Sequence, residues 1–346
     1  MSGMKRDLSC ALVAALLALA GCHDKKSPEA QEISTKTSEK NEVAPSAAPE
    51  PSEAPATQTG SKRVEVREAP PPEITLLEPG AEPFETLVLD PPDGLIEAFE
   101  MAMEMSIGMK LGDQRMPPMT PPTMVVGIQV ELKDKTDDAL HLSQRVLDTG
   151  LREISESAAP MAEAMREAMK GMEKFSADVE LSRTGALRKA SIVIADDLPP
   201  QVQQTVDQMI DNFGRLQVPL PNEPVGVGAR WTAKTNMELN GMSLEQVMTY
   251  RLDGREGTRL DLSVDIVQSL ASQTVAPPGM PPGSKVDIQR FVSKGSGNMK
   301  MDLAHLLPIE GRTNVELDMA MAVEAAGQKQ EMEMTMTMDV SLTGRP

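Results

Sequence analysis

Methionine alternates with other residues in two stretches that lie about 230 residues apart in the chain. A strand points alternate side chains to the same face, so each stretch would present a row of thioether sulfurs. Thioethers are soft ligands that can select Cu(I), and they also form flexible apolar surface. The first row is Met101, Met103 and Met105, and the second is Met332, Met334, Met336 and Met338.

The residues around these rows favour an apolar role over metal binding. Ile107 and Leu111 continue the first row, and Val340 and Leu342 continue the second. A metal site would interrupt the apolar row rather than extend it, so we expect no metal and no other cofactor. The seven methionines are therefore interpreted as core residues or as the wall of a site for a hydrophobic ligand. Cu(I) binding is a third alternative.

Catalytic motifs are absent from the sequence. His141 and His305 are the histidines of the predicted folded region, and His23 lies before it. The chain contains no Gly-x-Ser-x-Gly, no His-Glu-x-x-His and no Gly-x-Gly-x-x-Gly that opens a helix. The acidic residues are many, but their spacing singles out no catalytic pair. We therefore expect the protein not to be an enzyme.

The two cysteines lie in the N-terminal segment. Lys5 and Arg6 precede an apolar stretch over residues 8–20, which is too short to span a bilayer as a helix and is typical of a signal peptide. The stretch ends in Leu19-Ala20-Gly21-Cys22, which resembles the bacterial lipobox. The resemblance implies a signal peptide over residues 1–21, cleavage before Cys22, and attachment of diacylglycerol to the Cys22 thiol.

A lipid anchor of this kind would make the membrane a partner of the chain. Several acyl chains, each contributing about 0.8 kcal/mol per buried CH₂ group, anchor a protein stably. In bacterial lipoproteins, an Asp directly after the Cys favours retention in the inner membrane. His23 stands at that position and Asp24 follows it. The resemblance therefore implies a lipid-anchored protein of the cell envelope, with the outer membrane favoured over the inner.

Residues 22–75 are interpreted as the lipidated Cys followed by a disordered tether. The segment is rich in Pro, Glu, Ala, Ser, Thr and Lys and has few large apolar residues, so it cannot bury enough surface to offset the entropy of ordering. About 50 residues of flexible chain have an r.m.s. span of about 40 Å. We expect the tether to hold the folded region away from the membrane, with recognition of a partner as the alternative.

The net charge is −18. Residues 1–22 carry +1 and residues 23–78 carry −4, from 11 acids and 7 bases, which leaves about −15 for the folded region. A surface this acidic disfavours nucleic acid and anionic lipid headgroups as partners. An acidic surface could instead face a protein partner.

Period-two alternation predicts about ten long, mostly antiparallel strands over residues 76–346. The clearest are 99–111 and a hairpin formed by 315–323 and 332–342. Gly295 and Gly297 indicate a bulge or bend in one long strand, and Asp253-Gly254 indicates a turn. The other predicted strands are 124–132, 140–146, 175–181, 187–195, 231–239, 244–252, 260–266 and 286–303.

Two amphipathic helices are predicted between the strands. The first is capped by Ser157 and follows an apolar stripe to Met172, and the second runs over residues 202–213. The fold class is therefore α+β and predominantly β, with a curved sheet or open barrel on which the two helices pack. The folded region divides into possible halves at 84–215 and 216–346.

The junction from Leu220 to Trp231 resembles a segment of an uncharacterised domain family of bacterial lipoproteins, with the resemblance covering about 84–342. That family implies no activity. The expected architecture is similar to the half-barrels of periplasmic lipoprotein carriers, an analogy of fold alone. It favours a binding module for a lipid or other hydrophobic molecule. The alternative is a structural or interaction lipoprotein that presents an acidic β-surface to a protein partner.

Overall fold

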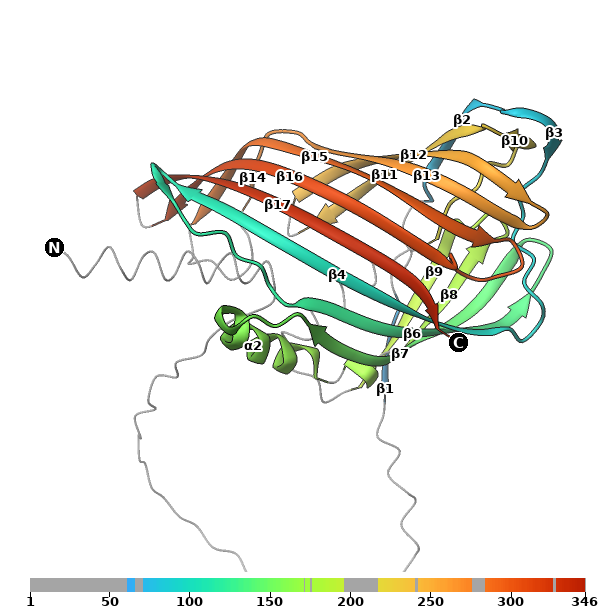
Figure 1. Ribbon diagram of the computed structural model, residues 1–346, viewed down its shortest axis with the longest axis horizontal. Coiled ribbons are helices and arrows are strands. Elements are labelled where there is room, and N and C mark those ends of the chain that lie inside the picture. Colours follow the sequence, from blue (N-terminus) through green and yellow to red (C-terminus); the bar gives the residue numbers. More distant parts are fainter. Residues whose placement is uncertain are drawn as a thin grey trace, which may run out of the picture.

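The computed structural model describes residues 61–65, 71–170, 172–174, 176–195, 217–239, 242–275, 284–325 and 328–345. These residues form one 15-stranded antiparallel sheet and a separate two-stranded sheet (Figure 1). The first part of the chain contributes β1 (Ser61–Glu65), β2 (Glu73–Glu78), β3 (Ala81–Glu85), β4 (Ile96–Leu111), β5 (Gln114–Arg115), β6 (Thr123–Lys135), β7 (Ala139–Arg152), β8 (Ser176–Ser182) and β9 (Leu187–Ala195). The second part contributes β10 (Val225–Val227), β11 (Arg230–Leu239), β12 (Met242–Glu256), β13 (Arg259–Leu270), β14 (Gln273–Val275), β15 (Lys285–Asp302), β16 (Glu310–Ala325) and β17 (Gln328–Arg345).

The predicted antiparallel, predominantly β fold is confirmed, but the predicted number of about ten strands is wrong. Every long strand that alternation predicted is present, and β16 pairs with β17 as the predicted hairpin. The additional strands are short, and β5, β10 and β14 have only two or three residues each. Alternation cannot be recognised over so few residues, because these strands form through pairing with longer neighbours.

The sheet begins earlier than the predicted folded region, and it spans both predicted halves. β1 lies within the range assigned to the tether and pairs with β9. β4 from the first half pairs with β17 from the second. The main path runs β1-β9-β8-β7-β6-β4-β17-β16-β15-β13-β12-β11-β2, and it ends at β1 and β2, so the sheet is open.

The first predicted helix is present as α2 (Ala159–Met169), with Pro160 in its first turn. Its predicted cap is wrong, because Ser157 belongs to a preceding 3₁₀ turn over Glu156–Ala158 and Ala158 occupies the N-cap without a side-chain hydrogen bond. Ala162 and Met169 are buried on its inner side. The second predicted helix, over residues 202–213, lies outside the described residues, and so does Cys22.

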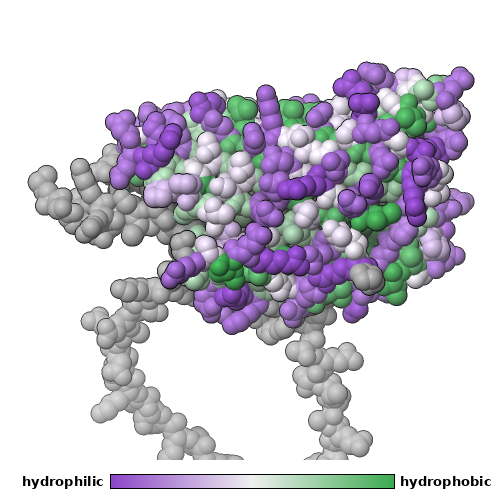
Figure 2. All heavy atoms as spheres, viewed as in Figure 1, coloured by the Kyte–Doolittle hydropathy of each residue, from purple (hydrophilic) through white to green (hydrophobic). Residues whose placement is uncertain are grey.

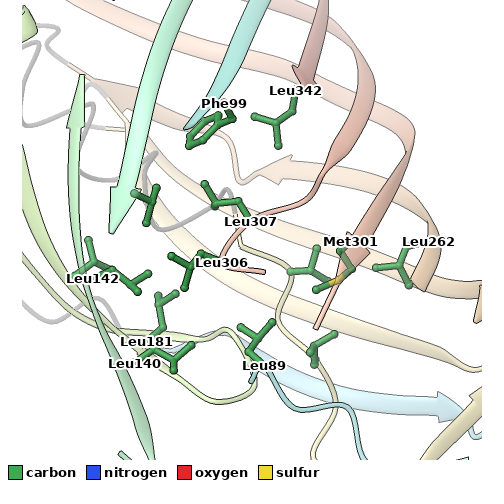
Figure 3. Close-up of a cluster of buried hydrophobic side chains, with 14 of the residues drawn as sticks. Leu89, Phe99, Leu140, Leu142, Leu181, Leu262, Met301, Leu306, Leu307 and Leu342 are labelled. Carbon is green, nitrogen blue, oxygen red and sulfur yellow. The ribbon is translucent and has the colours of Figure 1, made fainter. Parts of the chain in front are cut away.

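The sheet curves around a core to which both of its arms contribute. The larger cluster of buried side chains joins residues of β6 to β8 with residues of β11 to β13, although these strands lie on opposite sides of β4 and β17 in the sheet order. Figure 3 shows Leu140 and Leu142 on one side and Leu262 and Met301 on the other, with Leu306 and Leu307 between them. We call the face of the sheet that carries this core the inner face.

Two irregular segments fill the centre of this core. Leu87 and Leu89 precede β4, and Leu306 and Leu307 follow β15; all four are buried. Lys135 and Arg183 both bind the Asp90 carboxylate, at 3.0 and 2.9 Å, and Arg183 Nε also donates to the Leu89 carbonyl at 2.7 Å. These contacts fix the 87–90 segment against the strands, so the inner face is tightly packed at this end.

Candidate ligand-binding face

The two methionine rows lie side by side on the inner face. β4 and β17 pair antiparallel, with Met105 opposite Met338, Ile107 opposite Met336 and Met109 opposite Met334. β16 continues the same rows on the other side of β17, with Leu317 opposite Met336 and Met319 opposite Met334. Directly opposed residues share a face of the sheet. We call the inward side chains of β4 (101–111), β16 (315–323) and β17 (332–342) the methionine face.

All seven sequence-predicted methionines belong to this face, but their exposure differs. Met332 is 4% exposed and Met109, at the same end of the sheet, is 5% exposed. The other six predicted methionines are half-buried. The structure thus brings together residues from the first and the last long strand of the sheet, and it leaves the middle of their shared surface half-buried.

The half-buried middle lies between two separate clusters of buried apolar side chains. Towards one end, Met101 packs against the larger core, together with Leu342. Towards the other end, Met319, Met321 and Met332 form a second core with Val286 and Ile288. Among the described residues, neither cluster includes the six apolar residues between them, which are Met103, Met105, Ile107, Met336, Met338 and Val340.

A polar row crosses the inner face in register with this middle section. Gln246 of β12 lies opposite Gln268 of β13, Gln268 lies opposite Ser293 of β15, and the row continues to Leu317 and Met336. Ser293 Oγ donates to Gln268 Oε1 at 2.7 Å, and Gln268 Nε2 donates to Gln246 Oε1 at 2.8 Å. Ser293 is 1% exposed and Gln246 is 8% exposed.

The sequence interpretation did not select these three polar residues, although the sequence carries a signal for two of them. Gln246 and Gln268 occupy inward positions within otherwise apolar alternation, between Leu244 and Met248 and between Ile266 and Leu270. A polar residue at an inward position of a strand indicates a hydrogen-bond network or a ligand contact. Ser293 carries a weaker signal, because the glycines that follow it blur the alternation of β15.

No charged side chain lies on the inner face around this site. Three groups of inward described residues surround the site, and each of their members is apolar, glycine or polar without a charge. The groups are the inward residues of β12 from Met242 to Leu252, those of β13 and β15 where these two strands pair, and the methionine face. Burial of a charge without a partner is very costly. This part of the inner face is therefore suited to apolar and uncharged polar groups.

The outer face of the same strands is acidic and polar. Glu333, Thr335, Thr337 and Asp339 alternate with the methionines of β17, and Figure 2 shows this convex side as mostly hydrophilic or neutral. Near the end of β17, Arg345 binds Asp148 through two hydrogen bonds of 2.5 and 3.0 Å. The hydrogen bond from Arg345 lowers the pKa of the Asp148 carboxyl below its ordinary value.

The two histidines of the folded region lie on different elements of the structure. His141 lies on β7, and His305 Nδ1 contacts Glu97 Oε1 beside the segment that follows β15. Within the described part of the chain, no three His, Cys, Asp or Glu side chains are grouped closely enough to hold a metal ion. No helix in that same part is long and apolar enough to cross a membrane.

No protein-family model matches the chain, and no curated protein matches it either.

Proposed function

We propose that this chain is a lipoprotein of the cell envelope that binds a hydrophobic ligand, such as a lipid acyl chain, on the methionine face. The observation that carries the proposal is the half-buried middle of that face, which lies between two well-packed cores on the inside of a curved sheet. The proposal includes acylation of Cys22, which rests on the lipobox resemblance.

Removal of this surface from water supplies the driving force for binding. Each Å² of apolar surface that a ligand covers contributes about 25 cal/mol. Methionine side chains have three rotatable bonds and polarisable sulfurs, so they adapt to ligands of irregular or variable shape. A site built from Met103, Met105, Met336 and Met338 would accommodate acyl chains of more than one length, because none of these four side chains is a rigid aromatic ring.

The proposed anchor and tether fit such a function. A chain held to the membrane through Cys22, with about 40 residues between Cys22 and β1 that span about 35 Å, could reach lipids near the membrane surface. The net charge of the folded region would keep its outer face away from anionic headgroups. Because the described residues of the inner face around the site carry no charge, the uncharged part of a lipid would be the part that enters the site.

Native mass spectrometry combined with lipid extraction tests this proposal. Residues 23–346, which are the mature chain without the lipidated Cys22 and are called the mature chain below, are purified without detergent and measured under native and denaturing conditions. We expect a mass excess of a few hundred daltons in the native state only, and recovery of the same molecule in an organic extract. A native mass equal to the chain mass, both before and after incubation with total lipid extract, would contradict the proposal.

A second candidate function is the presentation of the outer face to a protein partner. The exposed carboxylates of β17, among them Glu331 and Glu333, and those of β16 lie on the outer face of the sheet, which Figure 2 shows as largely hydrophilic. Electrostatic complementarity would select a basic partner and would weaken with salt. Charge reversal of Glu331 and Glu333 to Lys should then abolish capture of that partner and leave lipid extraction unchanged.

Cu(I) binding is the third candidate, and the strand register supplies an observation for it. Met319, Met334 and Met109 lie in one row across three adjacent strands. Three thioethers on adjacent strands could approach a single soft ion. Competition against a Cu(I) chelator tests this candidate, and an affinity weaker than micromolar would exclude it.

A further inference from the structure

The strand β2 forms one of the two edges of the open sheet (Figure 1). One side of β2 pairs with β11, and no strand among the described residues pairs with its other side. In an antiparallel strand, alternate residues direct their N–H and C=O groups to opposite sides. The backbone groups of β2 that do not face β11 therefore form a row without a strand partner in the described structure. Such a row is a template for pairing with a further strand.

The side chains of β2 suit the addition of a strand. Ile74 and Leu76 lie on the inner face and pack against the larger core, but both are only half-buried. Thr75 lies between them in the sequence and is exposed. A strand added at this edge would continue the sheet and cover Ile74 and Leu76 with its own inward side chains. Each Å² of apolar surface covered in this way contributes about 25 cal/mol.

The two edges of the sheet differ in their protection against such pairing. Lysine, proline and bulges on an edge strand discourage the addition of another strand. The strand β1, at the other edge, carries Lys62 and Arg63. The strand β2 contains no Lys, Arg or Pro, and its register shift against β11 comes after Leu76. The residues from Glu73 to Leu76 therefore form a regular stretch of edge that is open to a partner.

The sequence of β2 is complementary to itself in one antiparallel register. When Thr75 lies opposite Thr75 of a second copy, Ile74 lies opposite Leu76 of that copy. Directly opposed residues share a face, so the apolar side chains of both copies stay on the inner face. Glu73 then lies opposite Leu77, and no two carboxylates oppose each other.

Other registers of the same pairing are less favourable. A shift by one residue would place the apolar side chains of the two copies on opposite faces of the joined sheet. A shift by two residues in one direction would place Pro72, which has no N–H donor, opposite Leu76. A shift by two residues in the other direction would place the Glu78 carboxylate opposite the apolar Ile74.

We propose that β2 pairs with β2 of a second copy of this chain, antiparallel about a two-fold axis that passes through Thr75. At the junction the two sheets become one continuous sheet, and the contact is the same patch on both copies. Only residues 73–77 of each copy form the strand pair, so we expect a weak dimer with a dissociation constant of about 100 µM. The inference is independent of the proposed function, because no residue of the methionine face takes part.

Sedimentation equilibrium of the mature chain tests this pairing. We expect the mean mass to rise from the chain mass towards twice that mass over about 10–300 µM. Thr75→Lys and Thr75→Glu each place like charges opposite each other at the axis, so each variant alone should dimerise about fivefold more weakly. An equimolar mixture of the two variants should recover the native affinity, because opposite charges then meet. The matched control is Thr335→Lys, an exposed position in the middle of the sheet, which should dimerise as the native chain does.

Three results of this experiment would overturn the inference. A native chain that keeps the chain mass at every concentration would leave the edge to a strand of another protein. Dimerisation of Thr75→Lys with the native affinity would place the contact elsewhere on the molecule. A mixture of Thr75→Lys and Thr75→Glu that stays as weak as its components would exclude a two-fold axis at this residue.

A disulfide gives a second measurement that does not depend on charge. Residues 23–346 contain no cysteine, so Thr75→Cys introduces a single thiol. Directly opposed residues have Cβ atoms about 4.5–5.5 Å apart, which a small adjustment brings within disulfide range. Diamide oxidises two thiols to a disulfide and is itself reduced, and we expect it to convert Thr75→Cys to a covalent dimer much faster than Thr335→Cys. Equal rates would overturn the inference. The fluorescence of Trp231, which is fully buried and opposite Leu76, reports whether each variant is folded.

Discussion

Met338 of β17 lies directly opposite Met105 of β4 on the inner face of the sheet. The two residues come from opposite ends of the folded region, and their pairing joins the two methionine rows into one surface. The antiparallel register continues from Leu111 opposite Met332 to Met101 opposite Leu342. The first and last long strands therefore meet in the middle of the sheet, and the proposed site forms only when both have folded.

Polar substitution of the methionine face should weaken ligand binding. Met336→Gln combined with Met338→Gln keeps side-chain length but replaces two apolar surfaces with amides. The probe is N-phenyl-1-naphthylamine, an uncharged hydrophobic dye whose fluorescence rises on binding. We expect its affinity to fall about tenfold or more, because each methionine contributes about 1 kcal/mol of apolar contact. The matched control is Thr335→Gln with Thr337→Gln on the outer face of the same strand. Equal affinities of the two double variants would contradict the assignment.

Oxidation should distinguish the middle of the methionine face from its buried end. Hydrogen peroxide converts a thioether to a sulfoxide and is itself reduced to water, and accessible methionines react first. We expect Met103, Met105, Met336 and Met338 to oxidise faster than Met319 and Met332, which are about 5% and 4% exposed. Peptide mass spectrometry over a time course measures the rates. A bound lipid acyl chain should slow the first group only, and uniform rates in all six would argue against a partly open face.

The ion pairs of Arg345 on the outer face should require a glycine at position 127, because a side chain there would occupy the space of the guanidinium. A Cβ atom at Gly127 would lie 2.8 Å from Arg345 Cζ and 2.8 Å from Asp148 Oδ1, where Arg345 also binds Glu100 at 3.1 Å. We expect Gly127→Ala to lower the free energy of unfolding by about 1–2 kcal/mol, because the guanidinium must leave its partners. Urea unfolding followed by Trp231 fluorescence measures the change.

Gly150→Ala is the matched control for this prediction. Gly150 lies on the neighbouring strand β7, and a Cβ atom there would meet nothing within 4 Å. Its substitution should leave stability unchanged or raise it slightly, since alanine restricts the unfolded chain. In an Arg345→Ala background, Gly127→Ala should lose most of its effect. A full effect in that background would show that crowding with the strand backbone, and not the ion pairs, explains the requirement.

Acid should loosen the segment that fills the larger core. Hydrogen bonding and attraction by Lys135, with a further contribution from Arg183, hold the pKa of Asp90 below its ordinary value of 3.8. A lowered folded-state pKa gives stability that is complete above the unfolded pKa and is lost as pH falls through the folded pKa. Asp90→Asn should therefore cost about 1 kcal/mol or less at pH 7. Native and variant stabilities should converge below pH 3.8, and a gap that persists in acid would exclude this linkage.

Alternation predicted most of the long strands because each has one apolar inward row, as β4 and β17 show most clearly. It could not predict that these two strands pair with each other, because a period of two fixes which residues share a face and not which strand lies alongside. The short strands β5 and β14 were missed for lack of length. The methionines of the site were identified from their alternation in the sequence. The half-burial of Met103, Met105, Met336 and Met338 could not be predicted, because it depends on how the two arms of the sheet curve over the inner face.

Glycine misled the sequence prediction at two positions, for different reasons. Gly295 does not mark the predicted bulge; the register shift lies between Ile288 and Arg290, and the ladder continues unbroken through Gly295. A Cβ atom at Gly295 would lie 2.9 Å from Val315 Cγ2, so a close neighbour on the inner face requires the glycine. Gly254 lies at a register shift within β12, and the turn comes at Gly257, where φ is +61°.

Photo-crosslinking tests the central claim most directly, because it locates a ligand rather than detecting one. The mature chain is incubated with a palmitoyl methyl ester that carries a diazirine midway along its chain, irradiated and mapped by peptide mass spectrometry. The account predicts that label concentrates on residues 101–107 and 334–340, and that excess methyl palmitate removes it. Label confined to the exposed apolar residues Leu77, Phe84 and Val227, or label that excess ester does not displace, would contradict it.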